Sequence, residues 1–283
     1  MAFHDLSKRL ILTVLSLAAT FVLLVFSHSP FVIGLILLLL IGLTETAIWE
    51  YSQLVGLKRN KKVMMLVMQL GALVILGCFL AAESTRFTLG PLIILVGSGV
   101  LLFLTQFRQI EGAANVIAKA FFGLCYIAVP LGFLLLILYS KGAMRGGDGR
   151  VYLGYLIVVT KSADIGAYLG GRMWGKRKLA PTLSPKKTVE GAVIGLAMAV
   201  GISFCCYLIS HFLPGFEITV RQSLLLGVLL GGFGQIGDLA ESLLKREAGV
   251  KDSNRLPGLG GALDLIDSLL LTTPILYIFF SIA

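Results

Sequence analysis

Long apolar runs separated by short polar segments constrain this chain more than any other feature. They fall at about residues 10–26, 31–49, 63–82, 90–106, 121–139, 151–171, 190–212, 223–240 and 263–282. Each is close to the ~20 residues that a helix needs to cross the hydrocarbon core of a bilayer. Because a backbone in lipid must satisfy its hydrogen bonds internally, we predict an all-α polytopic membrane protein with about nine transmembrane helices.

The composition excludes an ordinary soluble domain. Hydrophobic residues make up 57% of the 283 residues and charged residues 14%, whereas soluble chains carry ~25% charged residues. In a membrane protein a net charge of +9 indicates orientation and contact with anionic membrane lipids, so we expect no nucleic-acid partner. The four cysteines lie in apolar runs without a Cys-x-x-Cys pair, which indicates neither a disulfide framework nor a thiolate metal site.

The Lys and Arg side chains concentrate in alternate segments between the apolar runs, with groups at 58–62, 172–187 and 245–255. The positive-inside rule therefore predicts that the amino terminus lies in the cytoplasm. We expect the protein to be located in the cytoplasmic (inner) membrane. The same orientation puts residues 172–189 and 237–268 on the cytoplasmic face. We divide the chain into N-terminal anchor or scaffold helices, 1–140, and a C-terminal catalytic region, 141–283.

Several polar or small residues have a structural interpretation. Glu45 and Glu50, near the end of the second run, face the bundle or the membrane boundary, where a carboxylate costs little, and we favour a structural role. Four glycines have spacings that permit close approach of helices, so they predict packing contacts rather than ligand binding: Gly191, Gly195, Gly227 and Gly231.

The stretch from Gly237 to Ser268 places carboxylates between two apolar runs. Asp238 ends one run and Asp264 begins the next, so a pair of antiparallel helices would bring them together. Asp264 and Asp267 share one helix face. Clustered carboxylates suit a hard divalent cation, so we predict a metal site at Asp238, Asp264 and Asp267. Capping of the helix by Asp264 is the competing interpretation for that residue.

Glu241 and Lys245 also lie in this stretch, four residues apart. One interpretation is an ion pair on the helix surface, worth a few tenths of a kcal/mol. The other is that Lys245 points at a phosphate held beside Asp238. A similar choice applies to Lys161 and Asp164 in the sixth run, where each charge would cost roughly 2.5–3.5 kcal/mol at the bilayer centre. They either neutralise each other or line a wet cavity open to the cytoplasm, and we favour the cavity.

The segment from Gly170 to Gly191 is strongly cationic. It nearly spells a P-loop, but Arg177 stands where Ser or Thr is required, and a membrane helix rather than a strand precedes it. The cations either fix orientation against anionic lipid or cradle phosphate. We predict that residues 184–188 open the next helix, whose amino terminus favours anions.

Three stretches resemble the phosphatidate cytidylyltransferase family, also called CDP-diacylglycerol synthases. The family signature is matched by Ser242, Lys245-Arg246, Lys251-Asp252, Pro257, Gly260-Gly261, Asp264 and Asp267. SPKKTVEG at 184–191 nearly repeats the family's Ser-Pro-x-Lys-Thr-x-Glu-Gly, and KSADIGAYLGGR at 161–172 resembles its Asp-x-x-Ala-Tyr segment.

This chain departs from the family pattern in three places. Leu259 replaces a His, Leu265 replaces an Arg, and the segment between Asp252 and Pro257 is one residue shorter. Neither replacement is isosteric. Arg255 as a substitute for the missing cation is a hypothesis prompted by its nearness in sequence, and unchanged turnover of Arg255→Ala would reject it.

The resemblance implies an enzyme that joins CTP to phosphatidic acid, with Mg²⁺ as cofactor and K⁺ as a second ion. Catalytic roles are implied for Asp238, Lys245, Asp264 and Asp267. Substrate-binding roles are expected for Asp164, Arg172, Lys176, Ser184, Lys186, Lys187, Thr188, Glu190, Arg246, Lys251 and Asp252. Membrane lipids are expected partners, and a homodimer is one of the oligomeric states that the sequence allows.

Two alternatives remain. A CTP-dependent polyprenol or phytol kinase would transfer the γ-phosphoryl group to an alcohol, and product analysis separates it from a cytidylyltransferase. An ion transporter would place charges at broken helices near the membrane midplane, whereas the acids here cluster at the predicted cytoplasmic ends. A flux assay on liposomes without CTP tests that alternative.

Overall fold

The computed structural model describes residues 19–140, 147–250 and 261–282. Residues 19–25 are helical. The later helices are α2 (Pro30–Leu54), α3 (Lys61–Glu83), α4 (Gly90–Gln106), α5 (Ala113–Gly123), α6 (Val129–Tyr139), α7 (Gly149–Trp174), α8 (Val189–Ser210), α9 (Val220–Glu247) and α10 (Ala262–Ile282). A π-helical turn, η3 (Leu124–Ala128), joins α5 to α6, and short 3₁₀ turns occur at η1 (Leu57–Arg59) and η2 (Thr85–Phe87).

The predicted helical membrane architecture is confirmed. Every predicted apolar run from residue 31 onward corresponds to a described helix, while most of the first run, 10–26, lies outside the described residues. Within the described part of the chain, seven helical segments are long and apolar enough to cross a membrane. Helix α7 is not among them, because charged side chains such as Lys161 and Asp164 lower its hydropathy. The chain is an integral membrane protein.

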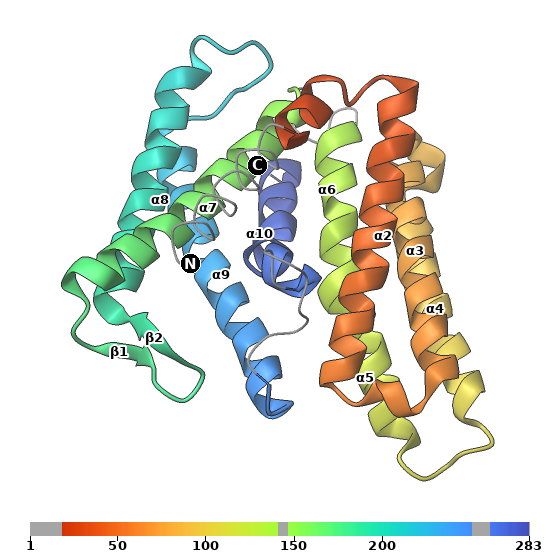
Figure 1. Ribbon diagram of the computed structural model, residues 1–283. Coiled ribbons are helices and arrows are strands. Elements are labelled where there is room, and N and C mark those ends of the chain that lie inside the picture. The colour runs from red at the N-terminus through yellow and green to blue at the C-terminus, as the bar shows by residue number, and fades with distance from the viewer. Residues whose placement is uncertain (1–18, 141–146, 251–260, 283) are drawn as a thin grey trace.

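The helices form two sets that share α10. Helices α2 to α6 pack together, α7 to α9 pack together, and α10 contacts α2, α6, α7 and α9. Figure 1 shows α10 between the two sets. Because α10 carries Asp264 and Asp267, both sets help to position these carboxylates.

Glycines allow the helices of the second set to approach closely, as predicted. A Cβ on Gly191 or on Gly195 of α8 would lie 2.6 Å from a backbone oxygen of α7, that of Ala167 or Ala163 respectively. Gly227 and Gly231 of α9 pack in the same way against α8. Any larger side chain would therefore push these helices apart, which confirms the packing role of all four glycines.

The cationic segment between α7 and α8 contains a β-hairpin that the sequence analysis did not predict. Strand β1 (Lys178–Ala180) pairs antiparallel with β2 (Ser184–Thr188), and Figure 1 shows the hairpin protruding from the bundle. The prediction that residues 184–188 open the next helix is wrong for residues 184–187, because pairing with β1 holds them extended. It is confirmed for Thr188, the N-cap of α8. Helix α8 begins at Val189, after Thr188 caps it by accepting a hydrogen bond from Gly191 N–H at 3.1 Å.

The opposite end of α7 is fixed by Asp148. Its Oδ1 accepts the Arg150 N–H at 2.9 Å, and the Arg150 guanidinium lies 2.6 Å from its Oδ2. The hydrogen bonds from Arg150 hold the pKa of the Asp148 carboxyl below its ordinary value. Asp148 therefore caps α7 as an ionised carboxylate.

Candidate active site

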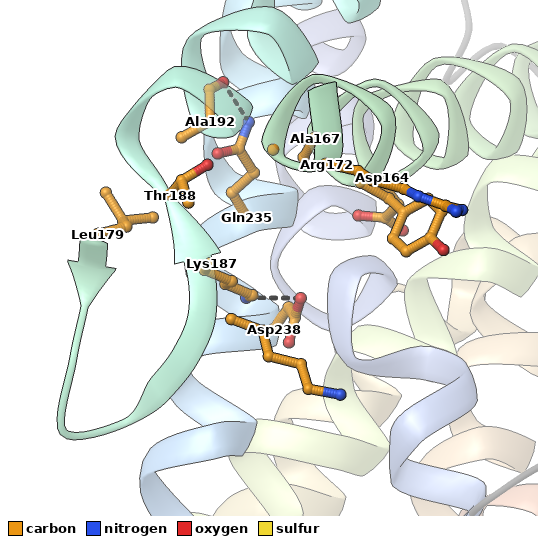
Figure 2. Close-up of a pocket in the computed structure, with 12 residues that line it drawn as sticks. Asp164, Ala167, Arg172, Leu179, Lys187, Thr188, Ala192, Gln235 and Asp238 are labelled. Atoms are coloured by element: carbon orange, nitrogen blue, oxygen red, sulfur yellow. Dashed lines mark hydrogen bonds and ion pairs between the residues drawn. The ribbon is translucent and has the colours of Figure 1, made fainter. Parts of the chain in front are cut away.

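A cavity of about 330 Å³ lies between the hairpin and helices α7, α8 and α9. Figure 2 shows Asp164 and Arg172 of α7 on one side, Thr188 and Leu179 of the hairpin on the other, and Gln235 and Asp238 of α9 between them. Its lining combines anionic, cationic and hydroxyl groups. The predicted site residues that line it are Asp164, Arg172, Lys186, Lys187, Thr188 and Asp238.

Asp238 and Lys187 meet in this cavity. The Lys187 Nζ lies 2.6 Å from the Asp238 Oδ2, and Figure 2 marks the contact. Both side chains are partly exposed, at 25% for Lys187 and 36% for Asp238. The Asp238 carboxylate is therefore open to a ligand, whereas the Lys187 nitrogen is itself buried, so a ligand reaches this ammonium group only when the ion pair opens.

Lys161 and Asp164 pair with each other, as one of the two interpretations predicted, and the opening of a wet cavity to the cytoplasm stays a prediction. The Lys161 Nζ lies 3.4 Å from Asp164 Oδ2 and donates to Ser268 Oγ of α10 at 2.8 Å. Asp164 also lines the cavity. The two charges therefore neutralise each other beside the cavity, which reduces the cost of placing them in an apolar helix.

A second ionic cluster joins α9 to the start of α10. The Lys245 Nζ lies 2.7 Å from Glu241 Oε2 and also forms an ion pair with Asp264 Oδ1. The exposed fractions of the Glu241 and Lys245 side chains are only 2% and 9%. The interpretation of this pair as a helix-surface contact is therefore wrong, because both side chains are buried inside the helical bundle. Asp264 Oδ2 accepts Gly261 N–H at 2.8 Å, so Asp264 caps α10 as well.

Helices α9 and α10 touch backbone to backbone between these clusters. A Cβ on Gly237 would collide with the carbonyl oxygen of Asp267. Three residues earlier on α9, Gly234 faces Thr160 of α7 and Ser268 of α10. Asp238 and Asp267 thus belong to turns of α9 and α10 that are in direct contact. Asp267 Oδ1 accepts the Ser268 N–H at 2.5 Å.

The other described residues of the predicted site belong to the hairpin segment or contact it, and they do not line the cavity. The exposed Glu190 carboxylate accepts the backbone N–H groups of Lys176 and Arg177 at 3.0–3.2 Å. Arg246 donates to Leu183 O, in the hairpin turn, at 2.9 Å. Ser184 lies at the start of β2, half-buried. Lys251 and Asp252 lie outside the described residues.

The donor chemistry suits a hard cation, since carboxylate oxygens are the ligands that Mg²⁺ prefers. In the described part of the chain no group of three His, Cys, Asp or Glu side chains is gathered closely enough to hold a metal ion. Asp238 and Asp264 instead have the lysines Lys187 and Lys245 as counter-ions. The residue types therefore fit a cation, and its ligands would have to exchange these lysines for it.

Three residues near the site were not singled out for it from the sequence. Gln235 lines the cavity and donates to Ala192 O at 3.1 Å, and Tyr168 lines it from α7. A polar Gln235 inside the apolar run 223–240 was an available signal. Glu50 of α2 is fully buried and bonded to α10, and no local pattern indicates a contact over such a separation.

The sequence of this chain is similar to those of several known proteins. The chain is 39% identical over 174 residues to the phosphatidate cytidylyltransferase of Chlamydia pneumoniae, covering 59% of this chain and 55% of that protein. It is 41% identical over 181 residues to that of Bacillus subtilis strain 168, covering 63% and 64%, and 44% identical over 135 residues to that of Staphylococcus aureus strain COL, covering 46% and 49%. The matched part is about half the length of the first of these relatives.

A family model covers nearly all of this chain. The model described as the cytidylyltransferase family matches residues 7–283, which include the cavity, the hairpin and the ionic cluster of α9 and α10. The chain belongs to the cytidylyltransferase family.

Proposed function

We propose that this protein is a phosphatidate cytidylyltransferase, an enzyme that joins CTP to phosphatidic acid. A phosphate oxygen of phosphatidic acid attacks the α-phosphorus of CTP. The new O–P bond forms as the bond from this phosphorus to the α,β-bridging oxygen breaks, so CDP-diacylglycerol and pyrophosphate are the products. The observation that carries the proposal is the cavity that joins Asp238 to Lys186 and Lys187, in a member of the cytidylyltransferase family.

The cationic side chains of the cavity have the chemistry to bind phosphates. Transfer of this type depends on positioning and charge neutralisation more than on a covalent nucleophile. Lys186 and Lys187 of β2 and Arg172 of α7 line the cavity and would hold the pyrophosphate portion of CTP or the lipid head group. The Thr188 hydroxyl also lines the cavity, beside the first amides of α8, and would add a hydrogen bond to the bound phosphate.

We assign the metal-binding role to Asp238, Asp264 and Asp267, with Mg²⁺ as the cofactor and K⁺ as a second ion. Such a cation, when bound, would supply the positive charge that neutralises phosphate in the transition state. Asp238 now binds Lys187, and Asp264 binds Lys245. In the substrate complex each lysine would exchange its carboxylate for a phosphate oxygen, which preserves charge pairing on both sides.

We further infer that the site faces the cytoplasm. The connection from α2 to α3 carries Lys58, and α3 begins with Lys61 and Lys62. This connection lies at the same end of the molecule as the hairpin and the carboxyl end of α9 (Figure 1). This common position of cationic segments supports a cytoplasmic site under the positive-inside rule. A homodimer is kept as an expectation that cross-linking in the membrane tests.

The decisive experiment follows the two ends of the CTP triphosphate separately. The purified protein is incubated with Mg²⁺ and phosphatidic acid, and in parallel with a long-chain isoprenoid alcohol, using CTP labelled at the α- or at the γ-phosphate. A cytidylyltransferase labels the lipid only from the α-position and only with phosphatidic acid. Label transferred to the alcohol from the γ-position would instead identify a lipid kinase and reject the proposal.

Two variants make the result specific. Asp264→Asn should abolish the labelled product or reduce it by at least about 100-fold, as for loss of a group that stabilises transition-state charge. Lys62→Gln, which removes an exposed cation at the start of α3, should label the lipid as the native protein does. Equal rates for native protein and Asp264→Asn would remove Asp264 from the site.

A further inference from the structure

Glu50 of α2 reaches across the molecule to the first turn of α10. It is fully buried. Its Oε1 accepts the Ala262 N–H at 2.9 Å and its Oε2 accepts the Leu263 N–H at 3.0 Å. Helix α10 is therefore capped by a carboxylate that lies 212 residues earlier in the chain.

This contact is chemically strong. The first amides of a helix have no partner within the helix, and a carboxylate there gains both charge-assisted hydrogen bonds and the favourable end of the helix dipole. The neighbouring Gly261 N–H donates to Asp264 Oδ2 at 2.8 Å. Two acids, Glu50 and Asp264, thus share the amino end of α10. Because Glu50 accepts the Ala262 and Leu263 N–H groups, Asp264 accepts only that of Gly261 among these three.

The end of α2 that carries Glu50 is itself fixed. The buried Tyr51 donates from its hydroxyl to Lys119 O of α5 at 2.9 Å, and Lys119 Nζ donates to Val55 O at 2.8 Å. The Tyr51 ring also packs over Gly123, where a Cβ would lie 2.7 Å from it. The carboxylate of Glu50 is therefore presented from a rigid support in the first set of helices.

The position of α10 decides where its acids point. Successive residues of an α-helix are rotated by about 100°, so a small rotation or axial shift of α10 would turn Asp264 away from Lys245 and Asp267 away from α9. Glu50 anchors the first turn, in which Asp264 lies, one turn before Asp267. The anchor and the acids are thus mechanically coupled.

We propose that Glu50 is a positioning residue that sets the geometry of the Asp264 and Asp267 carboxylates for cation and phosphate binding, an inference that rests on the proposed function. Through Glu50, the helices before residue 140 help to position the residues of the candidate site. Glu50 itself contacts backbone amides of α10 and acts through the acids that follow them.

Hydrogen exchange tests the contact without using activity. In Glu50→Gln the side chain keeps its size but loses one acceptor oxygen and presents an amide group to a backbone N–H. We expect the amides of Ala262 and Leu263 to exchange about tenfold faster, the ratio that corresponds to loss of one good helix cap. Glu45→Gln is the matched control, because Glu45 lies on the same helix and its half-buried side chain has no hydrogen bond or ion pair to a described residue. Equal exchange in Glu50→Gln and native protein would overturn the proposal.

Cation dependence then separates positioning from simple stabilisation. The rate of cytidine-lipid formation is measured against Mg²⁺ concentration for native protein, Glu50→Gln, Glu50→Asp and Glu45→Gln. We expect the Mg²⁺ concentration for half-maximal rate to rise by about tenfold in Glu50→Gln, to rise less in Glu50→Asp, which keeps the carboxylate, and to stay unchanged in Glu45→Gln.

The outcomes distinguish the two proposals. A native protein that makes no cytidine lipid would reject the proposed function. An active native protein whose Glu50→Gln variant loses rate by the same factor at every Mg²⁺ concentration would show that Glu50 only stabilises the fold, and would overturn the positioning role. A shifted Mg²⁺ midpoint together with faster exchange in α10 supports it.

Discussion

Lys187 of the β-hairpin and Asp238 of α9 form an ion pair, with 2.6 Å between Nζ and Oδ2, inside the cavity. The pair joins the cationic segment to the carboxylate stretch, which are about fifty residues apart in the chain. Both side chains are partly exposed, although the Lys187 nitrogen itself is buried, so a cation and a phosphate entering together can replace each partner only by opening this ion pair. The hairpin is therefore part of the candidate site as well as an extension of the bundle.

Removing the Lys187 charge should weaken binding of CTP more than it weakens the fold. A charge-assisted hydrogen bond is worth about 1.5–3 kcal/mol, so we expect the KM for CTP to rise at least tenfold in Lys187→Gln. The melting temperature should change little, since a partly exposed ion pair contributes at most ~1 kcal/mol. Steady-state kinetics and thermal unfolding in detergent measure the two quantities. A KM equal to that of Lys62→Gln would contradict this role.

The backbone contact at Gly237 predicts a sharp difference between two glycines of one helix. Gly237→Ala places a Cβ against the Asp267 carbonyl oxygen, so we expect a loss of about 1–3 kcal/mol of stability together with most of the activity. Gly232→Ala is the control, because no atom lies within 4 Å of its Cβ position. It should be neutral or slightly stabilising, since alanine favours the helix. Similar melting temperatures for the two variants would argue against the close crossing of α9 and α10.

The buried ionic cluster predicts a large effect of Lys245→Met. The substitution removes the ammonium group that pairs with both Glu241, whose side chain is 2% exposed, and Asp264. Breaking a buried pair costs about 3–5 kcal/mol, so thermal unfolding should occur on the order of 10 °C lower. Adding Glu241→Gln to Lys245→Met should restore part of the lost stability, because it removes the buried negative charge of Glu241. A double variant less stable than Lys245→Met would refute this account of the cluster.

The ionised cap at Asp148 predicts a defined pH dependence. Its pKa is lowered in the folded protein by hydrogen bonds from Arg150, so its stabilising effect is complete above the unfolded Asp pKa of ~3.9 and is lost as pH falls through the folded value. Asp148→Asn keeps a good capping residue but loses the charge. The variant should therefore unfold at a lower temperature than native protein at neutral pH, and the gap should close below about pH 4. A gap that persists unchanged at pH 3 would exclude the carboxylate charge as its cause.

Many residues of the candidate site could be predicted from the sequence, but their ion-pair partners could not. Asp164, Lys187 and Asp238 were expected near phosphate, and the structure brings them to one cavity. The partner of each charge was not predictable, because Lys187 finds Asp238 and Lys245 finds Asp264 only after the helices have packed. The hairpin was missed for a related reason, since a five-residue cationic strand has no apolar periodicity to reveal it.

By itself the sequence determined the membrane class, the helix positions from residue 31 onward and the residue types of the candidate site, because hydropathy and motif spacing are local properties of a chain. Only the tertiary structure decided which charges neutralise one another, that Gly237 brings α9 against Asp267, and that Glu50 of α2 caps α10. These contacts depend on the relative placement of helices far apart in sequence, which close packing and the pairing of buried polar groups select together.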